Sequence, residues 1–355
     1  MIFTYGQAYN GWKDTVPQNS DKPSHIRLKY ELEQRLSYLL IRLENGTFKP
    51  APLTLKNIYI PKKRVAQVPS VMDKIVQHMI CDNYLYEALT KPLIKETSAC
   101  LKNRGTDYAV DLLKEQLRRY YRLYGQEFYA LKCDIKSYFA SIPHDKLMIL
   151  IDRYVDDEDI KAIMLKYINL SEHGLALGLQ QSQLLANLYL SPLDHYCKEA
   201  LHAEFYDRHM DDFCIISNDK EYLEKCLQKI QIFVNNQGLS LNPKTEITHN
   251  KINYLGFTFY IDDNGKAVQR LLNDKKRTKK RHIRMMMREV IEGTRTVEEF
   301  VTSYQSWRAH VLNANCYKML EEWDEKIRVF LNSLGYDWKI KGNKVKLYVK
   351  DFEST

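Results

Sequence analysis

The sequence has no paired-cysteine motif, no internal repeat and no low-complexity tract. Its seven cysteines are scattered and odd in number, so we expect neither a disulfide framework nor a CxxC-type zinc site. The longest uncharged run, residues 174–193, holds three glutamines and an asparagine and is too polar for a membrane span. The first residues, MIFTYGQAYNGWKD, contain no apolar core of a signal peptide. These absences predict a cytoplasmic protein with no membrane partner.

Positive charge is in excess and is unevenly distributed. The net charge is +8, and the stretch 270–288 (RLLNDKKRTKKRHIRMMMR) carries nine Lys and Arg residues against one Asp. Such a cluster favours a polyanionic partner, although a solvated helix face has the same composition. With 355 residues and 45% hydrophobic residues, the chain has room for two or three domains with substantial cores.

Hydrophobic periodicity predicts helices and strands in a characteristic order. After a polar start, helices are expected over residues 24–48, 70–89, 104–125, 184–204 and 220–238. Strands are expected around a basic turn at 61–64, over 128–134, on both sides of residues 211–212, and in a hairpin at 251–269. The C-terminal stretch 338–351 is a candidate for a small hairpin. The fold class predicted is α+β with a mainly antiparallel sheet.

Three acids stand beside strong strand signals. Asp134 ends the stretch FYALKCD, and Asp211 and Asp212 interrupt the apolar segment FYDRHMDDFCIIS. Adjacent carboxylates raise each other's pKa, and burying them is costly unless a cation neutralises them. If the strands are neighbours, the three acids meet at one end of the sheet. Two-metal phosphoryl transfer requires such an array, and Mg²⁺ prefers oxygen ligands.

These residues lie in a series of motifs that resembles the reverse transcriptase family. Five matching segments are LKCDIKSYFASIPHDKL (131–147), LGLQQSQLLANLYLSPLD (177–194), RHMDDF (208–213), GLSLNPKTE (238–246) and YLGF (254–257). Two further segments, PKKR (61–64) and RGTDYAV (104–110), precede them in the chain and resemble the fingers motifs. They run in family order and cover about residues 50–315. The five motifs between residues 131 and 257, in this order, are far more specific than a lone Asp-Asp pair.

The resemblance implies a right-hand polymerase, in which an antiparallel sheet forms the palm. The expected divisions are an N-terminal helical extension (1–50), fingers (51–127), a palm with part of the fingers inserted (128–269), a basic helical thumb (270–335) and a short C-terminal tail (336–355). The implied cofactor is a pair of Mg²⁺ ions, for which Mn²⁺ can substitute. Their ligands would be Asp134, Asp211, Asp212 and the carbonyl of Ile135.

The resemblance also implies residues for the incoming deoxynucleotide. Phe139 would stand against the sugar and reject a 2′-hydroxyl, and Gly178 would allow close backbone approach. Gln183 would touch the template or the nucleotide. The triphosphate would be bound by cations of two segments, namely Lys62, Arg64 and Lys244.

A further group would contact template and primer. His209 replaces the Tyr usual in the Asp-Asp box, and it either fills the same slot or alters primer placement. The remaining candidates are Arg104, Gly256 of the primer-grip hairpin, and the thumb cations Lys275, Lys276, Arg277, Lys279, Lys280 and Arg281.

The segment Leu177–Gln183 is similar to the form typical of diversity-generating retroelements, and residues 303–320 resemble the thumb of that group. This implies an RNA-directed DNA polymerase that copies a companion non-coding RNA onto a DNA primer, with a small accessory protein or a second reverse transcriptase as partner. The alternative is an antiphage-defence reverse transcriptase that makes DNA on a non-coding RNA or without a nucleic-acid template. An inactive RNA-binding homologue is a third reading, which the three intact acids disfavour.

Overall fold

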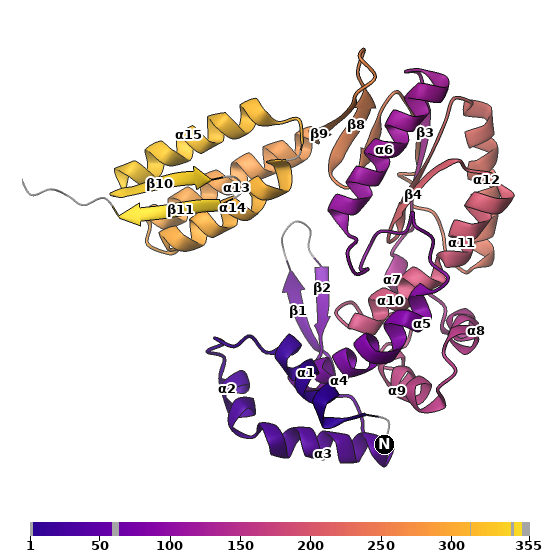
Figure 1. Ribbon diagram of the computed structural model, residues 1–355, viewed down its shortest axis with the longest axis vertical. Helices are drawn as coiled ribbons and strands as arrows, with labels where there is room; N and C mark the ends of the chain where they lie inside the picture. Colours follow the sequence, from indigo (N-terminus) through magenta and orange to yellow (C-terminus); the bar gives the residue numbers. More distant parts are fainter. Residues whose placement is uncertain (1–2, 59–63, 313, 342–343, 350–355) are drawn as a thin grey trace, which may run out of the picture. The chain divides into compact units, whose positions relative to one another are not determined.

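The computed structural model describes residues 3–58, 64–312, 314–341 and 344–349 (Figure 1). The chain forms two compact units, each made of two segments. The first contains residues 1–112 and 131–247, and the second contains residues 113–130 and 248–355. The chain therefore passes from the first unit to the second within helix α6 (Thr106–Tyr124) and returns within strand β3 (Tyr129–Asp134).

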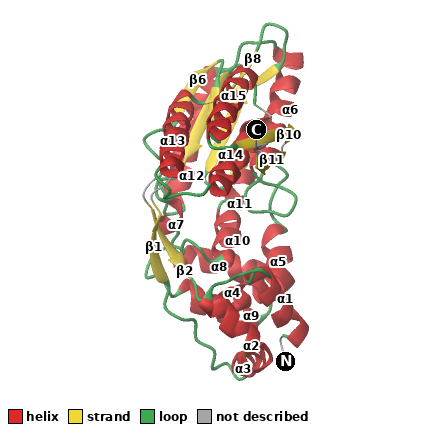
Figure 2. Cartoon of the chain, turned by 90° about the vertical axis from the view of Figure 1, so that its left-hand side faces the viewer, coloured by secondary structure: helices red, strands yellow, loops and turns green. Residues whose placement is uncertain are grey.

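The N-terminal part of the first unit is helical apart from one hairpin (Figure 2). Helix α1 (Tyr5–Thr15) begins at a capping box in which Thr4 and Gln7 bond each other's backbone. Within the helical extension expected over residues 1–50, this first helix lies where a polar start was expected, although the Thr-x-x-Gln pattern marks it. The hairpin pairs β1 (Thr54–Ile58) with β2 (Arg64–Val68), as expected on either side of the 61–64 turn.

Three predicted helices are interrupted in the structure. The helix expected at 24–48 is two helices, α2 (Pro23–Tyr30) and α3 (Leu32–Glu44), which meet at Glu31. The Glu31 carboxylate is bonded by arginines from both helices, which stabilises the junction. The helix expected at 70–89 consists of α4 (Val71–Ile80), the π-turn η1 (Cys81–Leu85) and α5 (Tyr86–Thr90). The helix expected at 184–204 consists of α10 (Gln180–Tyr189), α11 (Ser191–His195) and the π-turn η2 (Tyr196–Ala200). Pro192 explains the second break, because proline supplies no N–H and is favoured in a first helical turn.

The central sheet of the chain has the order β4-β5-β3-β6. Its strands are β3, β4 (Phe205–His209), β5 (Asp212–Ser217) and β6 (Glu246–His249). Strands β4 and β5 are antiparallel and largely buried, as the sequence predicts. Strand β6 was not predicted, because it is short and partly exposed on both faces.

Helices complete the first unit around this sheet. The helices not yet described are α7 (Tyr138–Ser141), α8 (His144–Tyr154), α9 (Glu158–Ile168) and α12 (Lys220–Asn236). Helix α12 packs on β5 and on α11, and α10 packs against α4, α5 and α8. Helix α12 ends before Gly238, which has φ +75°, so its predicted terminus is confirmed.

The second unit contains a three-stranded sheet and a helical part with its own core. The sheet, β7-β8-β9, is formed by β7 (Ile252–Tyr254), β8 (Phe257–Ile261) and β9 (Ala267–Leu271). The predicted hairpin around Gly265 is confirmed as the β8–β9 connection. The helices are α13 (Asn273–Ile291), α14 (Val297–Leu312) and α15 (Tyr317–Ser333), and a hairpin of β10 (Tyr336–Lys341) and β11 (Lys344–Val349) confirms the predicted C-terminal strands. Residues of α13, α14, α15 and β10 form one buried cluster.

No helix among the described residues is both long and apolar enough to cross a membrane.

Candidate active site

The three acids come together because their strands are neighbours. Asp134 is the last residue of β3, Asp212 is the first residue of β5, and β5 lies beside β3 in the sheet. Asp211 lies in the loop between β4 and β5, where His209 pairs with Asp212. The adjacency predicted from the sequence is therefore confirmed, whereas the role of these acids stays a prediction.

The β4–β5 loop is as short as a hairpin allows. It consists of Met210 and Asp211, and Met210 has φ +61°. A two-residue hairpin loop favours glycine where φ is positive, because a Cβ is strained there. Strain of this kind accumulates at functional sites and persists only when the surroundings enforce it.

A loop from another part of the chain holds Asp134. The Asn242 amide donates to Asp134 Oδ2 at 2.8 Å, and the Asn242 backbone N–H donates to the Asp134 carbonyl at 2.7 Å. Ile135 forms a bridge with Leu241, and its side chain is buried. In this loop the sequence predicted a role for Lys244, whereas Asn242 was not predicted.

Asp212 has a raised pKa. Burial, together with the charges of Asp134 and Asp211, raises its pKa to about 7, although Lys132 opposes the shift. Lys132 Nζ lies 3.3 Å from Asp212 Oδ1. Lys132 is two residues before Asp134 on β3, so both side chains leave the same face of the strand. Lys132 was not predicted, because the segment LKCD (131–134) does not show which strand lies next to it.

This donor set fits hard divalent cations. The three carboxylates and the Ile135 carbonyl offer the oxygen ligands that Mg²⁺ prefers. A dication would offset the mutual repulsion that contributes to the raised pKa of Asp212. Among the described residues, however, these acids do not form a group whose ligand atoms all lie within 4.8 Å of one another. Asp134 bonds Asn242 and Asp212 pairs with Lys132 instead.

A fully buried ion pair lies beneath the hairpin loop. Arg208 donates through Nε and Nη2 to the two carboxylate oxygens of Asp194, at 2.6 Å each. Its Nη1 donates to the carbonyl of Met210 at 2.8 Å. Tyr206 and Thr97 also donate to Asp194. Because an uncompensated buried charge is costly, this network holds the strained loop in one conformation.

His209 is bound into the same region through Ser98. The Ser98 hydroxyl donates to the Arg208 carbonyl at 3.0 Å, and His209 Nδ1 lies 2.9 Å from that hydroxyl. With the Ser98 proton so used, Nδ1 is the donor and Nε2 is left as an acceptor. Burial and then the neighbouring Arg208 lower the pKa of His209. The ring is therefore neutral at pH 7.

The residues predicted to bind the nucleotide are placed as follows. Phe139 is half-buried, whereas Gln183 and Lys244 are exposed. The backbone N–H of Lys244 donates to Asn242 Oδ1 at 3.1 Å, which ties the lysine to the loop that holds Asp134. Lys62 lies outside the described residues. The backbone of Arg64 begins β2, and its side chain is outside the description.

Gly178 has a packing reason to be glycine. Its φ is +121°, and a Cβ there would lie 2.4 Å from the Gln67 carbonyl of β2. Leu177 exchanges backbone and side-chain hydrogen bonds with Gln67 at 2.9 and 3.0 Å. Close approach to the β1–β2 hairpin thus demands glycine, whether or not a nucleotide also approaches.

Arg104, predicted to bind nucleic acid, has the Nη1 of its guanidinium bonded within the first unit. It donates to the carbonyls of Ile94 and Thr97 at 2.9 and 2.6 Å. Thr97 bridges to Arg208 of β4. The structure therefore gives Arg104 a role in shaping the loop beside the active-site hairpin.

In the second unit, Gly256 and the α13 cations are on separate elements. Gly256 and Leu255 form the β7–β8 loop, and both have positive φ, as a type I′ turn requires. On α13, Arg277 pairs with Asp274, and Lys279 lies over the Trp307 ring at 5.7 Å. The other four predicted cations on α13 are Lys275, Lys276, Lys280 and Arg281.

The chain resembles known proteins over the region that holds these acids. The family model described as reverse transcriptase (RNA-dependent DNA polymerase) matches residues 55–259. The group II intron-encoded protein LtrA of Lactococcus lactis subsp. cremoris is 24% identical over 218 residues, which are 56% of this chain and 35% of LtrA. Protein YkfC of Escherichia coli K12 is 25% identical over 195 residues, which are 50% of this chain and 49% of YkfC. The chain thus spans about a third of the length of LtrA and about half that of YkfC.

A solved structure is similar at a lower level. A telomerase from Candida albicans, in complex with the TWJ fragment of telomeric RNA, gives a TM-score of 0.49 at 11% identity, over 85% of this chain and 63% of its own.

The family match covers more than half of the chain and includes Asp134, Asp211 and Asp212. The predicted α+β class is confirmed, and helices with an antiparallel sheet in this order are those of a right-hand polymerase. The chain belongs to the reverse transcriptase (RNA-dependent DNA polymerase) family.

Proposed function

We propose that this chain is an RNA-directed DNA polymerase that works by two-metal nucleotidyl transfer. The observation that carries the proposal is the convergence of Asp134 with Asp211 and Asp212 on neighbouring strands of the matched domain. These acids and the Ile135 carbonyl would hold two Mg²⁺ ions, or Mn²⁺ in their place. When bound, such ions lower the pKa of an attacking hydroxyl and stabilise charge on phosphate oxygens.

The chain's own residues would position the reactants. Asn242 keeps the Asp134 carboxylate in place, and the Arg208–Asp194 pair fixes the loop that carries Asp211. Phe139 would exclude a 2′-hydroxyl, which is the group that distinguishes ribonucleotides from deoxynucleotides. Lys244 would bind triphosphate oxygens, and its exposed side chain is free to reach solvent.

In the proposed division, residues 51–127 are fingers, 128–269 palm and 270–335 thumb, flanked by an N-terminal extension (1–50) and a tail (336–355). The template would be a companion non-coding RNA, and the primer and product would be DNA. Within the family, the Leu177–Gln183 segment supports the diversity-generating retroelement type. A small accessory protein or a second reverse transcriptase would be the protein partner.

The test compares the wild type with an Asp211→Asn, Asp212→Asn variant in primer extension on RNA with Mg²⁺ and the four deoxynucleotides. We expect synthesis to fall by more than about 100-fold, because losing a ligand costs more than losing its support. The matched control is Asp156→Asn, Asp157→Asn, an exposed adjacent pair beside α9 that should retain full activity. Equal melting temperatures and equal RNA co-purification establish that both variants are folded.

Sequencing of co-purified RNA and of the DNA made from it distinguishes the biological roles. DNA complementary to a bound RNA, with errors concentrated at template adenines, supports the retroelement type. Accurate, repetitive or template-free DNA supports the antiphage-defence alternative. If the wild type and the double variant synthesise DNA equally, the acids are not catalytic and the proposal fails.

A further inference from the structure

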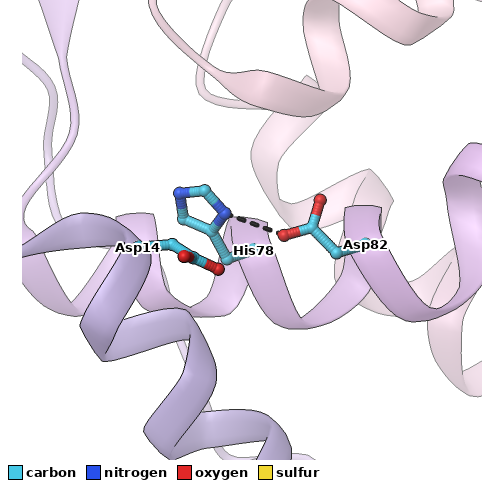
Figure 3. Close-up of side chains that lie close together, drawn as sticks. All are labelled: Asp14, His78 and Asp82. Atoms are coloured by element: carbon cyan, nitrogen blue, oxygen red, sulfur yellow. Dashed lines mark hydrogen bonds and ion pairs between the residues drawn. The ribbon is translucent and has the colours of Figure 1, made fainter. Parts of the chain in front are cut away.

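A second set of ligating side chains lies apart from the catalytic acids. It consists of Asp14 on α1, His78 on α4 and Asp82 in the π-turn η1 (Figure 3). Their ligand atoms all lie within 4.8 Å of one another, which makes them the group with this property among the described residues. All three belong to the first unit, and neither the catalytic proposal nor the motif analysis uses them.

Close packing of α1 on α4 brings these side chains together. A Cβ at Gly11 would lie 2.9 Å from the Ile75 carbonyl and 3.4 Å from His78 Cβ, so glycine permits the helices to approach at this point. Asp14 is about one turn further along α1, on the same side as Gly11. His78 and Asp82 are four residues apart, and their side chains meet across one turn. The π-turn that holds Asp82 is of a type often found at functional sites.

The group has more negative than positive charge. His78 Nδ1 lies 2.8 Å from Asp82 Oδ2, and this contact, followed by the charges of Asp82 and Asp14, raises the pKa of His78 against the effect of burial. One imidazolium offsets only one of the two carboxylates. Lys13, next to Asp14, has its ammonium over the Tyr9 ring at 4.7 Å. The charge of Lys102 also acts on Asp82. Within the group itself, one carboxylate charge is in excess over the imidazolium, which suits a cation.

The donor atoms select the kind of cation. Carboxylate oxygens alone would suit Mg²⁺ or Ca²⁺, whereas an imidazole nitrogen favours Zn²⁺ and related transition ions. A cavity of about 280 Å³ beside the group is lined in part by the amides of Gln7, Asn10 and Asn83, which can bond water ligands. Zinc binds nitrogen and oxygen at about 2.0–2.2 Å. Since the ligand atoms already lie within 4.8 Å of one another, each atom needs to move toward the ion by less than about 1 Å.

We propose that Asp14, His78 and Asp82 bind one Zn²⁺ ion that fastens α1 to α4. The bound ion replaces the proton that His78 shares with Asp82. Asp82 also accepts a hydrogen bond from Gln180 Nε2 at 2.8 Å, and Gln180 is the first residue of α10. The site therefore links the N-terminal extension to the helix that begins within the Leu177–Gln183 segment.

The test is calorimetric titration of ZnCl₂ into the full chain after treatment with EDTA. The Asp211→Asn, Asp212→Asn background is used so that zinc at the catalytic acids does not contribute. Added variants are Asp14→Asn and His78→Gln, and the matched control is Asp21→Asn, which removes one exposed acid outside the group. Co²⁺ in place of Zn²⁺ gives a visible absorption band that reports the ligand set.

We expect one Zn²⁺ per chain, with binding weakened at least about tenfold by Asp14→Asn and by His78→Gln and unchanged by Asp21→Asn. Zinc should raise the melting temperature of the background chain and not that of the two site variants. Absence of stoichiometric binding, or equal zinc affinity in the background and both site variants, would overturn the proposal. Neither result affects the polymerase proposal, because that proposal is tested with variants of other residues in a primer-extension assay.

Discussion

The amide of Asn242 holds the carboxylate of Asp134 while the backbone of the same residue holds the Asp134 carbonyl. Asn242→Ala keeps the backbone bond to Asp134 and removes both side-chain bonds, the one donated to Asp134 Oδ2 and the one accepted from the Lys244 N–H. We expect DNA synthesis to fall by about 10–100-fold, as is usual when the partner of a metal-binding carboxylate is removed. The measurement is steady-state primer extension across a Mg²⁺ titration, in which higher Mg²⁺ should recover part of the rate.

The matched control for Asn242→Ala is Asn235→Ala, on the exposed side of α12. This variant should have wild-type kinetics and the same Mg²⁺ requirement. Wild-type synthesis by Asn242→Ala at limiting Mg²⁺ would show that Asp134 needs no support from the loop.

Single residues differ in how far the sequence could predict them. The acids were found because carboxylates beside buried strands are costly and therefore conspicuous. Three residues were not predicted, namely Asn242, Lys132 and Asp194. Each is of a common residue type, and its importance depends on which strand or loop lies next to it. Asn242 and Asp134 are 108 positions apart, and only the folded sheet brings them together.

Among the elements, α11 and η2 make one of their contacts with the rest of the first unit through His195. Its Nδ1 lies 2.7 Å from Glu199 and its Nε2 lies 3.0 Å from the Pro92 carbonyl. Both neighbours are acceptors, and only the protonated ring donates from both nitrogens. The Glu199 bond first, and then the Pro92 bond, raise the pKa of His195.

This raised pKa makes a stability contribution that depends on pH. Since the folded-state pKa exceeds the unfolded value of about 6.5, the contribution is complete below that pH and is lost as pH rises through the folded-state pKa. The ring is partly exposed, so the contribution should be only about 0.3–0.5 kcal/mol. His195→Gln should therefore lower the melting temperature at pH 5.5 and leave it unchanged at pH 9.

The control for this element is His173→Gln, in an exposed loop, which should show no such pH dependence. A destabilisation by His195→Gln that is equal at both pH values would mean that the ring acts through packing and not through its charge.

Elements were predicted well in type and less well in extent. Periodicity located α12 and the β4–β5 hairpin, because each has a clear apolar face and a defined end. It failed where one apolar pattern continues through a break, as at Glu31 and Pro192. At those places tertiary contacts decide the direction of the chain, and the hydrophobic pattern does not record them.

At the scale of the whole molecule, the division into two units could not be read from the sequence. Both units are discontinuous, and the boundaries fall inside α6, β3 and β6 and not in linkers. The divisions implied by the family resemblance fall elsewhere, for example at residue 270, where the basic segment begins. Residue 270 lies in β9, and the basic helix α13 begins three residues later, at Asn273. Composition thus marks charged surfaces, whereas packing between distant segments defines compact units.

Helix α13 is the element of the second unit that we expect to bind nucleic acid. Its buried residues Ile283 and Met286 belong to the helical core, so the helix is anchored independently of any ligand. Because Arg277 and Lys279 have partners within the protein, we select three other cations for a variant in which each is changed to Gln, namely Lys275, Lys280 and Arg281. Removal of one phosphate-binding cation should reduce the slope of log affinity against log salt by about 0.9.

The triple variant should therefore bind an RNA–DNA primer–template more weakly, with a salt slope smaller by about two to three. Fluorescence anisotropy over a series of KCl concentrations measures both quantities. The matched control changes three exposed cations outside α13 to Gln, namely Lys251, Lys266 and Lys318, and removes the same charge from the same unit. If the slope decreases equally in both variants, the unit binds through its net charge. A decrease confined to the α13 variant means that this helix touches the phosphates, because only cations close to the backbone release counterions in that way.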